Sequence, residues 1–149
     1  MKRNLELRSG PFVLTAAACA VLLAPFVASG EEVTFEVSLS GPEASGDPDG
    51  RGEGTVTLNP ETNEVEVRLS YSNIAEPTTV LIRRGALGTE GNVVMPIVID
   101  SDEQGTLEGQ RRAAKPNVVE TIAAAPAEHY LVVVNSEYPI GALRGQLQE

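Results

Sequence analysis

Apolar and polar residues alternate in several short stretches of the chain. Residues 33–39 (VTFEVSL) have the period of two that is typical of a strand buried on one face. The alternation returns in EVEVRLSY at 64–71, after a shorter apolar run at 55–58 (TVTL). Because NPETN at 59–63 has the composition of a turn, these two segments predict a hairpin with a five-residue loop.

Four further segments continue the β pattern. TTVLIRR at 78–84 ends in a glycine-rich turn, and VVMPIVI follows at 93–99. Pro96 cannot donate a ladder hydrogen bond, so this strand is expected at a sheet edge or with a bulge. HYLVVVN at 129–135 is apolar on both faces, which predicts a central strand covered on both sides. GALRGQL at 141–147 is the last predicted strand.

One segment departs from this pattern and predicts a short helix over 118–125. Asn117 and Glu120 have the spacing of a capping box at its start, and Pro126 is expected to end it. DSDEQG at 100–105 is expected to form an acidic turn. Seven or eight short strands with one short helix predict an all-β domain, an antiparallel, Greek-key-like β-sandwich or barrel, over residues 31–149.

The first 30 residues differ from the rest and are expected to be a secretory signal peptide. Lys2, Arg3 and Arg8 precede an apolar run that ends in small residues, which predicts cleavage after Gly30. An uncleaved membrane anchor and a lipoprotein acylated at Cys19 are the alternatives. Cys19 is the one cysteine and lies in the leader, so the mature chain is expected to have no disulfide. After cleavage of the leader, the mature chain is expected not to insert into a membrane and to be periplasmic or extracellular.

Charge and composition narrow the function further. The chain has 11 basic and 21 acidic residues, of which the leader holds three and one. Nucleic acids and anionic membranes bind basic surfaces, so neither is expected as a partner. The acidic excess fits an exported protein that stays in solution, with cation binding or an acidic interaction surface as alternatives. Aromatic residues make up 4% of the chain and tryptophan is absent, which disfavours a sugar-binding platform.

Four segments together resemble the CHRD domain family over roughly residues 35–147. They are FEVSLSGPEASG, GDPDGRGEGTVTLNPETNEVEVRLSYSNI, LIRRGALGTEGNVVMPI and HYLVVVNSEYPIGALRGQL. Their order matches that of the family. The family-motif positions in this chain are Leu81, Arg83, Arg84, Gly85, Val134, Pro139, Gly141, Arg144, Gly145 and Gln146. The resemblance implies a secreted β domain and no specific activity.

The chain departs from the family pattern where the family has histidines. The family segment has two histidines around an isoleucine, whereas Leu81 and Arg83 flank Ile82 here. A third family histidine, in the closing strand, corresponds to Val134, and a family asparagine corresponds to Val132. Leucine, valine and a permanently protonated arginine neither bind metals nor transfer protons near neutral pH. We therefore expect Leu81 and Val134 to pack together and this chain to lack a histidine site.

The remaining candidate sites are weaker. Carboxylates alternate in the loop at Asp47, Asp49 and Glu53, a spacing that calcium loops use, although a solvated turn is the simpler interpretation. Asp100, Asp102 and Glu103 form a second such group. His129, the one histidine, is expected at the surface or a strand edge, without a catalytic or ligand role.

Three arginines complete the candidates. Arg83, Arg84 and Arg144 are expected to pair mainly with acidic side chains, with Arg83 and Arg84 as possible contacts for an anion or partner. Gly85, Gly88 and Gly91 follow a strand but open no helix, so they predict a turn and not a phosphate loop. The sequence favours a structural or binding role toward a protein or extracellular ligand, without catalysis or cofactor. A calcium-dependent adhesion module and a metal-dependent enzyme are the alternatives.

Overall fold

The chain folds into eight β-strands and one α-helix in a computed structural model that describes residues 31–41, 46–86, 88–112 and 114–148, without the side chains of residues 101 and 102. The predicted leader lies outside these residues. The elements in chain order are β1 (Val33–Ser40), β2 (Arg51–Asn59), β3 (Glu64–Ser72), β4 (Pro77–Arg84), β5 (Asn92–Glu103), β6 (Thr106–Arg111), α1 (Pro116–Ala124), the 3-10 helix η2 (Pro126–Glu128), β7 (His129–Asn135) and β8 (Leu143–Gln148).

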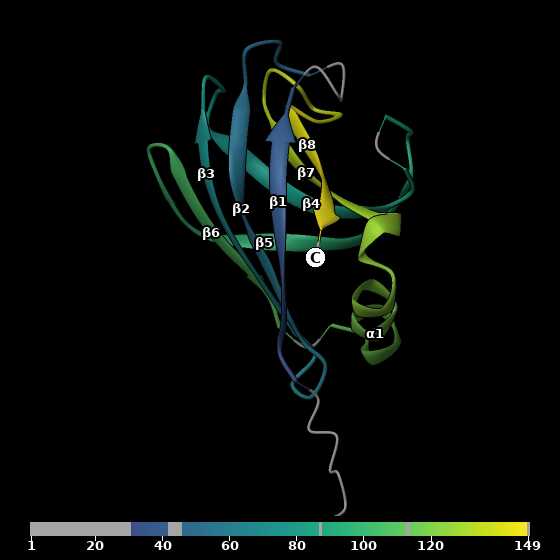
Figure 1. The fold of residues 1–149 in the computed structure, drawn as a ribbon. Coiled ribbons are helices and arrows are strands. Elements are labelled where there is room, and N and C mark those ends of the chain that lie inside the picture. The colour runs from purple at the N-terminus through teal and green to yellow at the C-terminus, as the bar shows by residue number, and fades with distance from the viewer. Residues whose placement is uncertain (1–30, 42–45, 87, 113, 149) are drawn as a thin grey trace, which may run out of the picture.

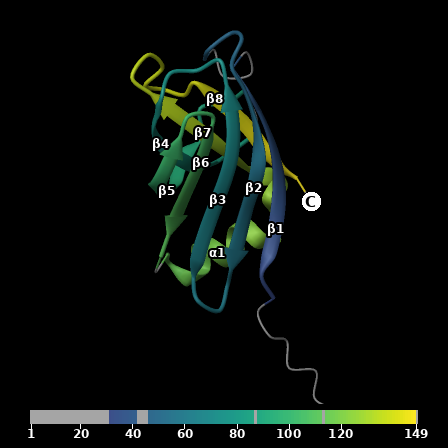
Figure 2. The ribbon, with the colours of Figure 1, turned by 90° about the vertical axis from the view of Figure 1, so that its left-hand side faces the viewer.

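The strands form a closed antiparallel barrel in the order β1-β2-β3-β6-β5-β4-β7-β8. Closure comes from β1, which pairs with β2 on one side and with β8 on the other. Because β3 lies beside β6 and not beside β4, the middle four strands have Greek-key connectivity. The predicted all-β class is confirmed, and the fold is a barrel (Figure 1). Figure 2 shows β1, β2, β3 and β6 side by side on one side of the molecule.

The predicted hairpin is confirmed as β2 and β3, which pair from Arg51 opposite Ser72 to Asn59 opposite Glu64. Its turn is stabilised by the Asn59 side chain, whose Oδ1 accepts hydrogen bonds from the backbone N–H groups of Glu61 and Thr62, both at 3.0 Å. The composition of NPETN therefore predicts the turn correctly, because asparagine side chains cap such turns.

Side chains from all eight strands and from the helix fill the interior of the barrel. Alternate residues of each strand point inward, so the period-two pattern of the sequence becomes a single apolar core. The buried strand residues include Phe35, Val56, Val67, Ile82, Ile97, Leu107, Leu131, Leu143 and Leu147, and α1 adds Val119 and Ile122. The helix lies beside one end of the barrel (Figure 1) and contributes to the same core.

The helix begins earlier than predicted. Its first residue is Pro116 and its N-cap is Lys115, whose side chain makes no capping hydrogen bond. The predicted capping box of Asn117 and Glu120 is therefore wrong. Proline suits the first helical position because its φ is already helical and it lacks an N–H that the helix would leave unpaired. The helix ends at Ala124, before Pro126, as predicted.

Strand β5 carries bulges and is not at an edge. Its register shifts once against β4, near Val94, and once against β6, near Asp100. Pairing with β6 begins only at Val98, so Pro96 lies where one side of β5 is unpaired. The strand continues to Glu103, and the turn reaches Gly105 at φ +93°. The acidic segment 100–105 is thus mostly strand, with a shorter turn than predicted.

Candidate functional site

The three positions where the family has histidines lie on the outer face of two neighbouring strands. Val80 and Ile82 of β4 face the core, so Leu81 and Arg83, which alternate with them, point outward. On β7, Val134 points to the same side. Leu81 pairs with Val132, and Arg83 pairs with Tyr130. Val134 is opposite Thr79, so it is a diagonal neighbour of Leu81 and not its direct partner.

The glycine-rich turn between β4 and β5 is hydrogen-bonded to this outer face. The Tyr130 hydroxyl donates to the Thr89 carbonyl oxygen at 2.8 Å and accepts from the Gly91 N–H at 2.9 Å. Gly91 has no room for a side chain, because a Cβ there would lie 1.8 Å from the Arg84 carbonyl oxygen. Gly85 has φ +147°, a conformation that favours glycine. The motif glycines therefore shape a turn, as predicted.

Two arginines contact the same turn. Arg83 Nη1 donates to the Gly91 carbonyl oxygen at 3.2 Å, and Arg144 Nη1 donates to the Thr89 carbonyl oxygen at 3.4 Å. The Arg144 guanidinium also lies 5.9 Å from the centre of the Tyr130 ring. Neither arginine pairs with a carboxylate among the described residues. Arg83 and Arg144 thus bind backbone carbonyls, and the predicted acidic pairing is not found for them among the described residues.

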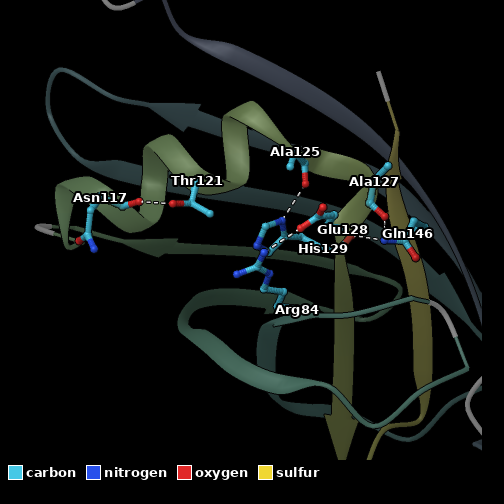
Figure 3. Close-up of polar contacts among 8 residues, drawn as sticks. All are labelled: Arg84, Asn117, Thr121, Ala125, Ala127, Glu128, His129 and Gln146. Carbon is cyan, nitrogen blue, oxygen red and sulfur yellow. Dashed lines mark hydrogen bonds and ion pairs between the residues drawn. The ribbon is translucent and has the colours of Figure 1, made fainter.

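Arg84 behaves differently and forms an ion pair with Glu128, with 2.9 Å between Nη2 and Oε2 (Figure 3). Both side chains are more than half exposed, so the pair contributes little to stability. The predicted acidic pairing is correct for Arg84. Arg84 is a poorer candidate for an anion contact than predicted, because its guanidinium already donates a hydrogen bond to Glu128.

His129 is buried and not at the surface, so the prediction for its position is wrong. Only 1% of the residue is exposed, and its Nδ1 lies 2.8 Å from the Ala125 carbonyl oxygen (Figure 3). It packs where η2 joins β7, a junction that the sequence could not place against the barrel. A single buried ring with one backbone partner fits a structural role.

The closing motif residues also make structural contacts. Gln146 Nε2 donates to the carbonyl oxygens of Ala127 and His129, both at 2.7 Å, and so ties β8 to η2 (Figure 3). A Cβ at Gly145 would lie 2.2 Å from the Ser38 carbonyl oxygen, so only glycine fits beside β1. Gly141 has φ +145° in the loop that follows the exposed Pro139. The closing-motif residues Gly145 and Gln146 thus allow β8 to lie close to β1 and to η2.

An acidic group lies in the loops near the start of β2. Asp47 is 8% exposed and adjoins Asp49 and Glu137. Burial raises the pKa of the Asp47 carboxyl, and a side-chain hydrogen bond to Asp49 with the negative charges of Asp49 and Glu137 raises it further. Burial and the same carboxylates raise the pKa of the Tyr138 hydroxyl. Glu137, which the sequence analysis missed, therefore lies near Asp47, whereas Glu53 lies in a groove on β2.

The groove that contains Glu53 runs over the outer face of β1, β2, β3 and β6, on the opposite side of the barrel from β4 and β7. Its volume is about 740 Å³. Four glutamates line it: Glu36, Glu53, Glu103 and Glu108. Arg68 lies among them and pairs with Glu66 at 2.6 Å and Glu108 at 3.8 Å. The polar residues of the period-two pattern form this groove, although the sequence alone indicated only that they face solvent.

Comparison with known proteins confirms the family resemblance of the motif residues. The family model described as CHRD domain matches residues 32–147. The chain belongs to the CHRD domain family. No curated protein and no solved structure matches it.

Two features are absent from the part of the chain that the structure describes. In it, no three His, Cys, Asp or Glu side chains are arranged to hold a metal ion. The same residues contain no helix of the length and apolar character needed to cross a membrane. The calcium candidates Asp47, Asp49 and Glu53 stay a prediction. The second group, Asp100, Asp102 and Glu103, also stays a prediction, because it includes Asp102, whose side chain the structure does not describe.

Proposed function

We propose that this protein is an exported, non-catalytic interaction module that binds a positively charged partner through the groove on β1, β2, β3 and β6. The observation that carries the proposal is the clustering of Glu36, Glu53, Glu103 and Glu108 along one outer face. The interior of the barrel is filled by apolar side chains, so the outer surface is the natural place for a partner.

The charges in the groove support a basic partner. Arg68 is the one positive side chain among the groove residues, and its contacts to Glu66 and Glu108 engage its charge. The excess of carboxylates leaves a negative field over the groove, which attracts lysine and arginine side chains and excludes acidic partners. Hydroxyl groups of Ser38, Thr55, Ser70 and Thr106 lie among the carboxylates and add hydrogen-bonding capacity.

The contacts of His129 and Arg84 support a role without catalysis. His129 is buried against a backbone carbonyl, and Arg84 pairs with Glu128. Catalysis by nucleophile and base needs a reactive side chain within hydrogen-bond reach of a general base, with access for a substrate. Export rests on the predicted leader of residues 1–30, with its basic start and apolar run.

The test is a binding titration of the mature protein with a lysine-rich peptide and, in parallel, a glutamate-rich peptide of equal length. We expect saturable binding of the lysine peptide only. The variant E36Q/E53Q should weaken that binding at least about tenfold, a change of about 1.4 kcal/mol. E31Q/E120Q removes the same charge outside the groove and should change the affinity less than about threefold. Equal weakening in both variants would show unspecific charge attraction and overturn the proposal.

A calcium-dependent module is the second candidate, because the buried Asp47 lies in the negative field of Asp49 and Glu137, although these three carboxylates are not arranged to hold a metal ion in the structure as it stands. A cation bound only by the folded state raises the melting temperature. A rise of several degrees in millimolar calcium that disappears in Asp47→Asn would support this second candidate over the first.

A further inference from the structure

Arg144 is a buried cation with unusually weak partners. The residue is 5% exposed. Two of its guanidinium nitrogens reach the carbonyl oxygens of Thr89 and Ile140, each at 3.4 Å, which is long for a hydrogen bond. Its Nε is buried and has no partner among the described residues. No described carboxylate lies within 4.0 Å of the guanidinium.

Arg83 has the same deficit beside it. Within the described part of the chain its Nε is also buried without a partner, and Nη1 donates to the Gly91 carbonyl oxygen. Arg83 is opposite Tyr130, and Arg144 is opposite Val132, the next outward-facing residue of β7. The two side chains therefore lie diagonally across β7, and both reach the turn at residues 89–91.

An uncompensated pair of this kind is costly. Guanidinium stays protonated at any ordinary pH, so burial cannot be relieved by loss of a proton. Buried charges are normally paired, because desolvation removes the water that would otherwise stabilise them. Two carbonyl contacts at 3.4 Å and an aromatic ring offset this cost only in part. The chain has 21 acidic residues, yet none of those described is placed against these two arginines.

We propose that Arg83 and Arg144 form a receptor for an oxyanion, a carboxylate or a phosphate, bound beside the turn between β4 and β5. Guanidinium matches the planar arrangement of carboxylate and phosphate oxygens, and the two buried Nε atoms are donors without a partner among the described residues. Arg83 is partly exposed and gives the ligand its entry, whereas Arg144 lies deeper under Ile140. This receptor is independent of the acidic groove across the barrel.

The direct test is nuclear magnetic resonance of the arginine Nε–Hε groups in the mature protein. Acetate and inorganic phosphate are titrated separately at constant ionic strength, with chloride as the balancing anion. We expect the Nε–Hε signals of Arg83 and Arg144 to shift together and saturate, while that of Arg84 stays in place. The acetate and phosphate arms decide which oxyanion is preferred. Signals that do not move, or that drift linearly without saturation, would overturn the proposal.

Matched variants test the assignment. R83K keeps the positive charge but loses the planar set of N–H donors of the guanidinium, and we expect it to weaken anion binding at least about tenfold. R84K makes the same change in the neighbouring residue that already pairs with Glu128, and its affinity should equal that of the original protein. Equal affinity in R83K and R84K would contradict the proposal. If R83K does not unfold cooperatively on heating, the NMR titration of the original protein alone tests the proposal.

Glu43 belongs to the segment outside the described residues, and a third variant tests it as an internal counter-ion. An unchanged anion affinity in E43Q supports a receptor for an external ligand. Saturable binding that appears in E43Q and is absent from the original protein would show that the carboxylate of Glu43 occupies the site, and would overturn the proposal.

Discussion

The Tyr130 hydroxyl and the Gly91 N–H are joined by a hydrogen bond of 2.9 Å that attaches the turn after β4 to the outer face of β7. The same hydroxyl donates to the Thr89 carbonyl oxygen. One side chain thus satisfies two backbone groups of a turn that has little secondary structure of its own. The position of this turn sets the surroundings of Arg83 and Arg144, so the tyrosine also positions the proposed receptor.

Tyr130→Phe removes both hydrogen bonds and keeps the ring. We expect a loss of about 1–3 kcal/mol in the free energy of unfolding, because the Gly91 N–H loses its partner and the Thr89 carbonyl oxygen keeps only the long hydrogen bond from Arg144. Urea unfolding measures it. Tyr138→Phe removes the hydroxyl of a partly exposed tyrosine and should cost less than about 0.5 kcal/mol. Equal costs would show that the hydroxyl of Tyr130 does not hold the turn.

Gln146→Glu tests the contact between β8 and η2 with almost no change in shape. The amide donates to two carbonyl oxygens at 2.7 Å, and a carboxylate would place negative charge against both. We expect a loss of about 2–4 kcal/mol in unfolding free energy. Gln148→Glu makes the same change at an exposed position of the same strand and serves as the control. A Gln146→Glu protein as stable as its control would contradict the structural role of the amide.

Asp47→Asn should change how stability depends on pH. The folded state raises the pKa of this carboxyl above its usual value of 3.8, so the folded protein holds the proton more tightly than the unfolded chain does. The fold therefore loses stability as pH rises from about 3.8 through the raised pKa. Asparagine carries no charge, so we expect the variant to be more stable than the original at pH 7 and to lose that advantage near pH 3.

Urea unfolding at several pH values between 3 and 7 gives this difference, with Glu120→Gln as the control on an exposed helix position. The prediction fails if the difference between the original protein and Asp47→Asn is constant over the range.

Ile122→Ala tests whether α1 belongs to the barrel core. Ile122 is fully buried, and its loss should cost about 2–5 kcal/mol because a cavity remains. Glu120→Ala on the exposed side of the same helix should change stability by less than about 0.5 kcal/mol. Thermal and urea unfolding report both. Equal effects would show that helix propensity, and not packing against the barrel, sets the contribution of α1.

Most of the fold could be predicted from the period-two pattern, because a strand buried on one face records its orientation in its own sequence. The β2–β3 hairpin and the doubly covered β7 follow from local residues alone. Closure could not be predicted, because the pairing of β1 with β8 joins segments about 100 residues apart and leaves no local pattern. The helix start was misplaced because two competing signals, a capping box and a proline at the first position, lay next to each other.

The candidate site was predicted in part. The motif positions identified the right turn and the right strands. The sequence could not show that Arg84 pairs with Glu128, whereas Arg83 and Arg144 pair with no described carboxylate. Such pairings depend on which side chains the barrel brings together. A usable signal was present for Tyr130, since an aromatic residue with a polar tip in a doubly buried strand needs a hydrogen-bond partner outside that strand.

Closure through β1 and β8 has a consequence for how the protein is made. The first strand finds its second neighbour only in the last strand, so a chain still growing on the ribosome has no closed barrel to form. Contacts between such distant segments also form slowly. For a chain exported as proposed, this delay is useful: an unfolded chain can be threaded through a translocation channel, and the barrel closes after the final strand has passed.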